Sequence, residues 1–299
     1  MTSAPDQPVT ATPTAVGAPR PAWWRRASAP WRDLPDHLIL GAMKAGTTHL
    51  DRLLAANPAV QPRPWKECRM LTEPGVTTLA YRARYDLRFR RRRRERETGR
   101  PERIGDASPY DLFHPRAPET ARRLVPDARF IVILRDPAER AWSHHRHAVR
   151  HGFERLGFEA AIAAEPDRLR GEEARLAADP RATSGPHQHW SYLARGRYAV
   201  QLERWFAAFP RDRFLVLFTD HLATDPRSVL AAIQRHLDLP PTPNPPFGEI
   251  ANRGDGSGPP AAIAARLRAE FAPDDDRLAA LLGVTPPWRI AASSITDRP

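Results

Sequence analysis

The sequence predicts an α/β fold in which helices flank a central parallel sheet, and two observations support that prediction. Three short apolar runs, at residues 37–40, 129–134 and 214–218, are typical of strands that a sheet buries on both faces. Stretches with helical periodicity follow these runs, and strands that alternate with helices form parallel sheets. Such sheets bind ligands at the carboxyl ends of their strands, so we expect the functional residues just after the runs.

The expected helices follow from apolar spacing and from residues that start or stop a helix. The first, at residues 47–56, begins after a glycine-containing turn and ends before Asn57-Pro58. The second, at residues 138–150, begins after Pro137, a residue that the first turn of a helix tolerates. Further helices are predicted at residues 198–209, 227–237, 261–271 and 275–282, with a Pro/Gly-rich loop at residues 240–260.

Composition predicts a flexible tail at residues 1–34 and a single domain at residues 35–299. The tail is rich in Pro, Ala and Thr, and we expect its tryptophans to pack against the domain. Cys68 is the only cysteine, which excludes an intramolecular disulfide. The sequence has no run of about 18 apolar residues and no signal-peptide pattern, so we expect a cytoplasmic protein without stable membrane insertion.

Charge is the strongest compositional feature of the 299-residue chain. The formal net charge is +11 and the pI is near 10.8, which favours anionic partners. Of 46 Lys and Arg residues only Lys44 and Lys66 are lysines, and a compact ammonium suits contact with a single atom that accumulates charge. An arginine-rich run occupies residues 88–96. Such runs are usually solvated and self-repelling, and docking to an acidic acceptor or a membrane surface is the functional alternative.

The segment GAMKAGTTHL, at residues 41–50, has the context of a phosphate-binding loop. It lies between a predicted strand and a predicted helix, where backbone N–H groups and a helix N-terminus bind phosphate. A Walker A loop places its lysine directly before Ser or Thr, whereas Lys44 precedes Gly46 by two residues. This displacement indicates a donor nucleotide and a transferred group that differ from those of an NTPase.

The loop resembles the one that binds the 5′ end of the donor in sulfotransferases that use 3′-phosphoadenosine 5′-phosphosulfate (PAPS). The resemblance implies a P-loop-like sulfotransferase fold, in which the lysine serves the transferred sulfuryl group. PAPS would be the donor, adenosine 3′,5′-bisphosphate (PAP) would be the product, and no metal would be required. The residues implied at the 5′ end of the donor are Lys44, Ala45, Gly46, Thr47 and Thr48.

Two further segments resemble the family's 3′-phosphate-binding elements. Arg135 directly follows a predicted strand and Ser143 lies about two helical turns later, so both side chains can converge on one phosphate. Arg253 and Gly254, in the late loop, resemble the basic-Gly loop that covers the same phosphate in many members. The fuller Arg-Lys-Gly form is lacking here.

Lys66-Glu67 resembles the K-E pair of the heparan-type branch, in which the glutamate is the candidate general base. A carboxylate can take a proton from an acceptor hydroxyl or amine. Lys66 would contact the donor or the acceptor. Asp106 and Ser108, in GDASPY, resemble the family segment that lines the active-site cleft, and a plain turn is the alternative for them.

Two other patterns predict structural roles. His144, His145 and His147 have no acidic or cysteine partners arranged with them, so no metal site is expected. Tyr198 and Trp205 belong to a late block that matches the family, and its helical spacing predicts packing.

The resemblance covers residues 36–255 and implies transfer of a sulfuryl group from PAPS to a hydroxyl or amine of a carbohydrate, lipid or natural product. Glu67 would deprotonate the acceptor, and Lys44 would stabilise charge at the bridging oxygen.

One alternative is a P-loop kinase or NTPase, which would need magnesium. A second is a nucleic-acid-binding module built on the arginine run, although no recognised motif supports such a partner. A third is a sulfotransferase fold that binds without catalysing. The acceptor, the choice between O- and N-sulfation and the oligomeric state stay open, and the Arg, Ala and Pro content favours a bacterial source.

Overall fold

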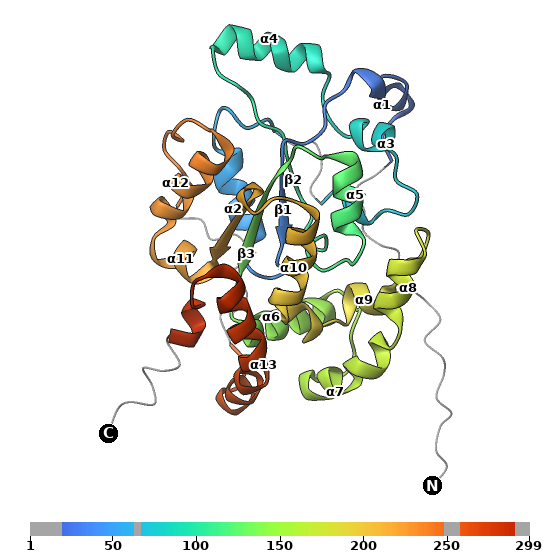
Figure 1. The fold of residues 1–299 in the computed structure, drawn as a ribbon, viewed down its shortest axis with the longest axis vertical. Coiled ribbons are helices and arrows are strands. Elements are labelled where there is room, and N and C mark those ends of the chain that lie inside the picture. Colours follow the sequence, from blue (N-terminus) through green and yellow to red (C-terminus); the bar gives the residue numbers. More distant parts are fainter. Residues whose placement is uncertain (1–19, 63–66, 248–257, 291–299) are drawn as a thin grey trace.

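The computed structural model describes residues 20–62, 67–247 and 258–290. At its centre lies a four-stranded sheet with the order β2-β1-β3-β4 (Figure 1). All three strand pairings are parallel, which confirms the predicted fold class. The strands are β1 (His37–Gly41), β2 (Gly105–Ala107), β3 (Arg129–Leu134) and β4 (Phe214–Phe218).

Helices cover both faces of this sheet. The helices α2 and α12 lie on one face, and α5 and α10 lie on the other (Figure 1). Trp205 of α10 is fully buried, and its ring centroid lies 5.2 Å from that of Phe130 in β3. A second, smaller hydrophobic cluster joins α6, α7 and α13. The helices beside the sheet are α2 (Thr47–Ala55), α5 (Ala117–Leu124), α6 (Pro137–Arg150), α10 (Tyr198–Ala208), α11 (Thr219–Thr224) and α12 (Pro226–Leu237).

The remaining helices form the two ends of the molecule (Figure 1). One end carries α1 (Trp23–Ala27), α3 (Thr78–Arg82), α4 (Arg88–Thr98) and the 3-10 turn η1 (Ala29–Trp31). The other carries α7 (Phe158–Leu169), α8 (Glu172–Ala178), α9 (Gly185–His189), η3 (Ala194–Gly196) and α13 (Ala261–Leu282). The 3-10 turn η2 (Met70–Thr72) packs against α5. The turn η4 (Arg211–Arg213) leads into β4. No helix in the described residues is long and apolar enough to cross a membrane.

One sequence prediction about elements is wrong, and one strand was not predicted. Residues 261–282 form one helix rather than two, with Pro273 inside it. Phe271, Asp275 and Leu278 are buried along one continuous face of α13, so tertiary packing outweighs the local cost of the proline. Strand β2 was not predicted, because Gly105–Ala107 is too short and too polar to stand out.

Within the predicted tail of residues 1–34, the structure forms α1 and η1 at residues 23–31. Arginines rather than tryptophans attach this segment to the domain. Nε of Arg25 donates to the Ala83 carbonyl at 2.9 Å, and Nη1 of Arg32 donates to the Tyr85 carbonyl at 2.6 Å. The predicted packing of the tryptophans against the domain is not observed, since Trp23 is 79% exposed.

Candidate donor and acceptor site

The loop between β1 and α2 carries Lys44 at the carboxyl edge of the sheet. The Ala42 amide donates to the carbonyl of Ile133 at 2.7 Å, which ties the loop to β3. Lys44 and Gly46 have positive φ angles, 71° and 98°, so the chain turns sharply before α2 begins. A φ of 98° suits glycine, which has no Cβ to clash with the backbone.

The first turn of α2 holds the amides that the sequence analysis predicted to bind phosphate. Amides at a helix start have no acceptor within the helix, and the helix dipole adds partial positive charge there. The Ala45 amide is engaged inside the loop instead, since it donates to the Ala42 carbonyl at 3.1 Å. The Ala45 carbonyl accepts from the Thr219 hydroxyl, 2.6 Å away at the end of β4. Of the residues predicted to bind the 5′ end of the donor, Ala45 thus has its amide and its carbonyl engaged within the protein, whereas Gly46, Thr47 and Thr48 lie at the start of α2.

Arg135 lies beside this loop because β1 and β3 are neighbours and end at the same edge. Its Nη1 is 3.5 Å from the Lys44 carbonyl oxygen. Nε and Nη2 donate to Oε2 of Glu139 at 3.1 and 2.6 Å. The Tyr198 hydroxyl donates to the Arg135 carbonyl at 2.8 Å and fixes the backbone at this point. The structure thus brings together the two motifs that the sequence analysis assigned to the donor.

Helix α6 turns a partly exposed face toward the same edge. Glu139, Ser143 and His147 follow each other at helical spacing, on the side away from the buried residues of α6. Burial, with a contribution from the nearby Lys44 ammonium, lowers the pKa of His147 to about 4. His147 is therefore neutral at pH 7 and lies near Lys44. The sequence analysis gave it only a structural role, although its spacing of four residues from Ser143 was an available signal.

Glu67 lies on the other side of the loop, where the chain passes the carboxyl end of β2. The Arg69 amide donates to Oγ of Ser108 at 2.9 Å, and that hydroxyl donates to Oδ1 of Asp106 at 3.3 Å. The Tyr81 hydroxyl donates to Oδ2 of Asp106 at 2.9 Å. Asp106 and Ser108 are both buried. This chain of hydrogen bonds favours a role for them in positioning the Glu67 segment rather than in touching the substrate.

A cluster that the sequence analysis missed extends this side of the site. The Tyr110 hydroxyl is 2.7 Å from Nδ1 of His187, and the Arg195 guanidinium lies 4.8 Å from the centroid of the Tyr110 ring. Nη1 of Arg195 is 2.8 Å from the sulfur of Met43, which is the residue before Lys44. Arg69 lies 5.4 Å from the same Tyr110 ring. The cluster therefore joins the Glu67 segment to the Lys44 loop.

Burial sets the charges in this cluster. It lowers the pKa of Arg195 to about 9, so the guanidinium stays charged at pH 7. Burial, followed by the charge of Arg195, lowers the pKa of His187 to about 2, which leaves this imidazole neutral. Burial and the Asp106 carboxylate hold the pKa of Asp111 well above its usual range, and Glu67 adds to that effect. The cluster therefore holds two positive charges, the buried Arg195 and Arg69, which lies two residues from the candidate base.

Three predicted site residues, Lys66, Arg253 and Gly254, lie outside the described residues. Within the residues that are described, no group of three His, Cys, Asp or Glu side chains could hold a metal ion.

Residues 34–252 match the family model of the sulfotransferase domain. The chain belongs to this family. The predicted enzyme class is confirmed at the level of the family, and the match decides against the P-loop kinase or NTPase alternative.

Curated relatives agree with the family match. The chain is 27% identical over 231 residues to the bifunctional heparan sulfate N-deacetylase/N-sulfotransferase 1 of Caenorhabditis elegans, an alignment that covers 71% of this chain and 23% of the relative. It is 23% identical over 272 residues to the membrane-associated sulfotransferase kil1 of Dictyostelium discoideum, over 69% of this chain and 56% of the relative. The chain thus spans about a quarter of the heparan sulfate enzyme and about half of the second relative.

A solved structure supports the same family. The sulfotransferase from Alicyclobacillus acidocaldarius aligns with a TM-score of 0.61 and 28% identity, over 84% of this chain and 97% of that protein.

Proposed function

We propose that this member of the sulfotransferase family transfers a sulfuryl group from PAPS to a hydroxyl or amine of an acceptor. The observation that carries the proposal is the placement of Lys44 on a positive-φ loop before α2, with Arg135 beside it. A helix N-terminus and two cations at one sheet edge suit a donor that is anionic at both ends.

The donor fits this edge through residues of three elements. Gly46, Thr47 and Thr48 bind the 5′ end with their amides. Arg135 and Ser143 bind the 3′-phosphate. Because the Arg135 guanidinium is hydrogen-bonded to Glu139, the phosphate takes the place of that carboxylate when PAPS binds. Arg253, Gly254 and Lys66 stay predicted members of the site.

The transfer step needs a base on the acceptor side and a cation on the leaving-group side. The acceptor oxygen or nitrogen attacks sulfur, and Glu67 takes its proton. The bond between sulfur and the bridging oxygen breaks, and Lys44 stabilises the negative charge that PAP gains there. The products are PAP and a sulfate ester or a sulfamate. No metal enters this scheme.

We propose an acceptor that carries negative charge, with a carbohydrate as the first candidate. Arg69 and Arg195 place positive charge around Tyr110, next to the Glu67 segment. A relative is a heparan sulfate N-sulfotransferase by name, which favours a glycan amine or hydroxyl over a lipid or another natural product. The cytoplasmic location and the bacterial source stay predictions.

The test measures PAP release from PAPS in EDTA, with N-deacetylated heparan, other glycans and phenols as acceptors. Acceptor-dependent release is the expected result. Glu67→Gln should slow turnover by about a hundredfold or more, since a general base contributes ~10²–10⁴. It should leave PAP affinity unchanged, because Glu67 lies on the acceptor side. Glu73→Gln is the matched control, since Glu73 is exposed and follows closely in sequence.

Consumption of ATP that depends on magnesium, without PAP release from PAPS, would contradict the proposal. So would equal losses of turnover in the Glu67 and Glu73 variants.

A further inference from the structure

Five of the nine exposed large apolar side chains of the described residues, including all three exposed tryptophans, gather at one end of the molecule. Trp23, Trp24, Trp31, Leu79 and Phe89 are each at least half exposed, at 79%, 50%, 65%, 53% and 61%. They belong to α1, η1, α3 and α4, which lie together at the end away from α7 and α13 (Figure 1). Soluble proteins usually scatter such side chains singly, and a gathering of them marks an interaction surface.

Polar contacts hold these elements together without the tryptophans. Nη2 of Arg25 donates to the carbonyls of Arg84 and Tyr85 at 2.9 and 2.8 Å. Nη1 of Arg82 donates to the Arg32 carbonyl at 2.5 Å. Trp23 and Trp31 are thus left on the outside of a segment that arginines fasten to the domain, whereas the half-exposed Trp24 ring packs against the guanidinium groups of Arg25 and Arg32.

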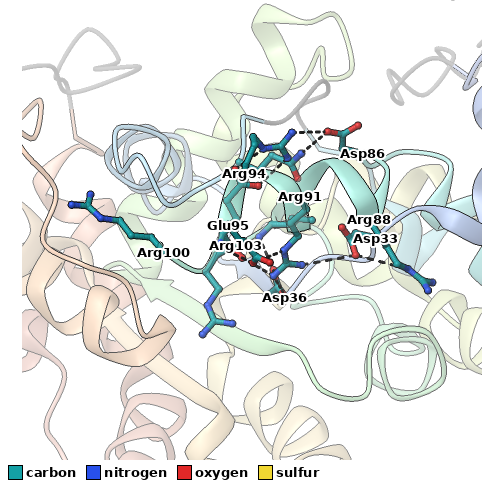
Figure 2. Close-up of polar contacts among 12 residues, drawn as sticks. Asp33, Asp36, Asp86, Arg88, Arg91, Arg94, Glu95, Arg100 and Arg103 are labelled. Atoms are coloured by element: carbon teal, nitrogen blue, oxygen red, sulfur yellow. Dashed lines mark hydrogen bonds and ion pairs between the residues drawn. The ribbon is translucent and has the colours of Figure 1, made fainter. Parts of the chain in front are cut away.

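Helix α4 adds a dense positive charge to this end. It contains seven arginines and two glutamates, a net formal charge of +5 over 11 residues, and none of its residues is buried. Its inner side is neutralised by acidic side chains (Figure 2): Arg91 pairs with Asp36 at 3.2 Å and Arg94 pairs with Glu102 at 2.6 Å. These pairs explain why a run expected to be self-repelling forms a helix.

The outer side of α4 is basic and carries one aromatic ring. Phe89, Arg92, Arg93 and Arg96 follow at i, i+3, i+4 and i+7, which places them on one face, and all four are exposed. Charge is also crowded where α4 meets α1. Burial and neighbouring arginines, Arg90 among them, lower the pKa values of Arg25 and Arg32. An anionic surface would relieve this repulsion.

We propose that this end of the molecule docks on a lipid bilayer that contains anionic phospholipids. The docking surface, here called the basic-aromatic face, consists of Trp23, Trp24, Trp31, Leu79, Phe89, Arg92, Arg93 and Arg96.

The chemistry of the face matches a bilayer interface. Tryptophan and phenylalanine partition into the headgroup region, and arginines pair with lipid phosphates. The helices of this face are too short and too polar to span a bilayer, so the face would rest on its surface. Three tryptophans and a leucine favour a bilayer over a nucleic acid, whose interfaces are more polar and depend on phosphate contacts.

The position of the face has a consequence for the enzyme. Arg91 of α4 pairs with Asp36, which directly precedes β1, so α4 lies at the amino end of the sheet. The donor loop follows the carboxyl end of β1. A docked molecule therefore keeps its donor site turned away from the bilayer.

The test is sedimentation of the full-length protein with two kinds of vesicle, phosphatidylcholine alone and phosphatidylcholine mixed with phosphatidylglycerol. Binding is expected only to the anionic vesicles. The triple variant Arg92→Gln, Arg93→Gln, Arg96→Gln should bind them about a hundredfold more weakly, given ~1 kcal/mol per basic residue at such a surface. A double variant, Trp23→Ser with Phe89→Ser, should also lose binding.

A matched control removes the same charge elsewhere. Arg170, Arg181 and Arg266 are exposed and lie on or beside α7, α8 and α13, so their replacement by Gln should leave vesicle binding unchanged. All variants should keep wild-type PAP affinity, which reports an intact fold.

Three outcomes would overturn the proposal. One is equal binding to both vesicle types or to neither, and another is an equal loss of binding in the control triple variant. The third is evidence for a different occupant of the face, observed without vesicle binding. Such evidence would be tight binding to a nucleic acid duplex, or a dimer that the Trp23 and Phe89 replacements dissociate.

Discussion

Lys44 is the residue on which the proposed chemistry depends most directly. Its positive φ of 71° and the turn at Gly46 place it at the start of α2, next to the amides that would bind the donor. His147, held neutral by burial and by Lys44, adds no competing cation. Lys44 is thus the cation of the loop itself, with Arg135 approaching from β3.

Replacing Lys44 by Arg should separate binding from catalysis. The guanidinium keeps the charge but spreads it over a planar fork, so turnover should fall by about 10²–10³, the range for a lost stabiliser of transition-state charge. PAP affinity should change far less, because PAP lacks the transferred group. Turnover and PAP titrations on the same preparation provide the comparison. Equal losses in both quantities would assign Lys44 to binding alone.

Glu139 is the second residue with a specific consequence. Its carboxylate accepts two hydrogen bonds from Arg135, so it competes with the 3′-phosphate for the same guanidinium. Glu139→Gln should therefore tighten PAP binding by about twofold to fivefold, which is the scale of a partly exposed ion pair. Glu119→Gln, at an exposed position on α5, is the control for a general change in net charge. Weaker PAP binding by the Glu139 variant would show that this carboxylate positions Arg135 rather than competing for it.

At the scale of elements, the strands that are continuous apolar runs were predictable, and the short polar strand β2 was not. The runs that became β1, β3 and β4 are apolar, and the motifs that follow β1 and β3 were found because each follows such a run. Gly105–Ala107 pairs with β1 only in the folded chain. Nothing local in the sequence marks it as a strand.

The residues of the candidate site also divide into those that the sequence indicated and those that it did not. Lys44, Arg135 and Glu67 lie in short motifs, so sequence alone indicated them. Arg195 reaches Met43 from 152 positions along the chain, a contact that only the tertiary fold creates. The sequence likewise did not indicate a role for Glu139, because that role depends on the hydrogen bonds that Arg135 makes to it in the folded chain.

Helix α13 supplies a test at the same scale, through Asp275. Nε1 of Trp288 donates to Oδ2 of Asp275 at 3.0 Å, and burial raises the pKa of this carboxyl to about 6. The folded chain therefore holds the Asp275 proton more tightly than the unfolded chain. The protonated Asp275 carboxyl therefore adds to the free energy of unfolding below about pH 4, and this contribution is lost as pH rises toward 6.

Replacing Asp275 by Asn should remove this loss of stability at higher pH, because an amide does not ionise. The variant should be more stable than the wild type by about 1–3 kcal/mol at pH 7, and the difference should shrink as pH falls from 6 to 4. Urea unfolding at several pH values measures it. A variant that is less stable at every pH would mean that the Trp288 hydrogen bond requires the carboxylate.

At the scale of the whole molecule, the chain has a net charge of +11, and two of its basic regions lie at opposite ends of the sheet. The carboxyl edge of the sheet carries Lys44 and Arg135 for an anionic donor. The basic-aromatic face carries the exposed arginines Arg92, Arg93 and Arg96 of α4. Because the two lie at opposite ends of the strands, anionic vesicles should not compete with PAP.

Calorimetric titration with PAP in EDTA tests the central claim, that a metal-free donor site lies at the carboxyl edge of the sheet. The proteins to compare are the wild type, Arg135→Ala and, as a control, Arg170→Ala on the exposed connection after α7. The account predicts that wild type and control bind PAP equally, and that Arg135→Ala binds more weakly by about 1.5–3 kcal/mol, the range for a charged hydrogen bond. Unchanged PAP binding by Arg135→Ala, or binding of ATP with magnesium in place of PAP, would contradict it.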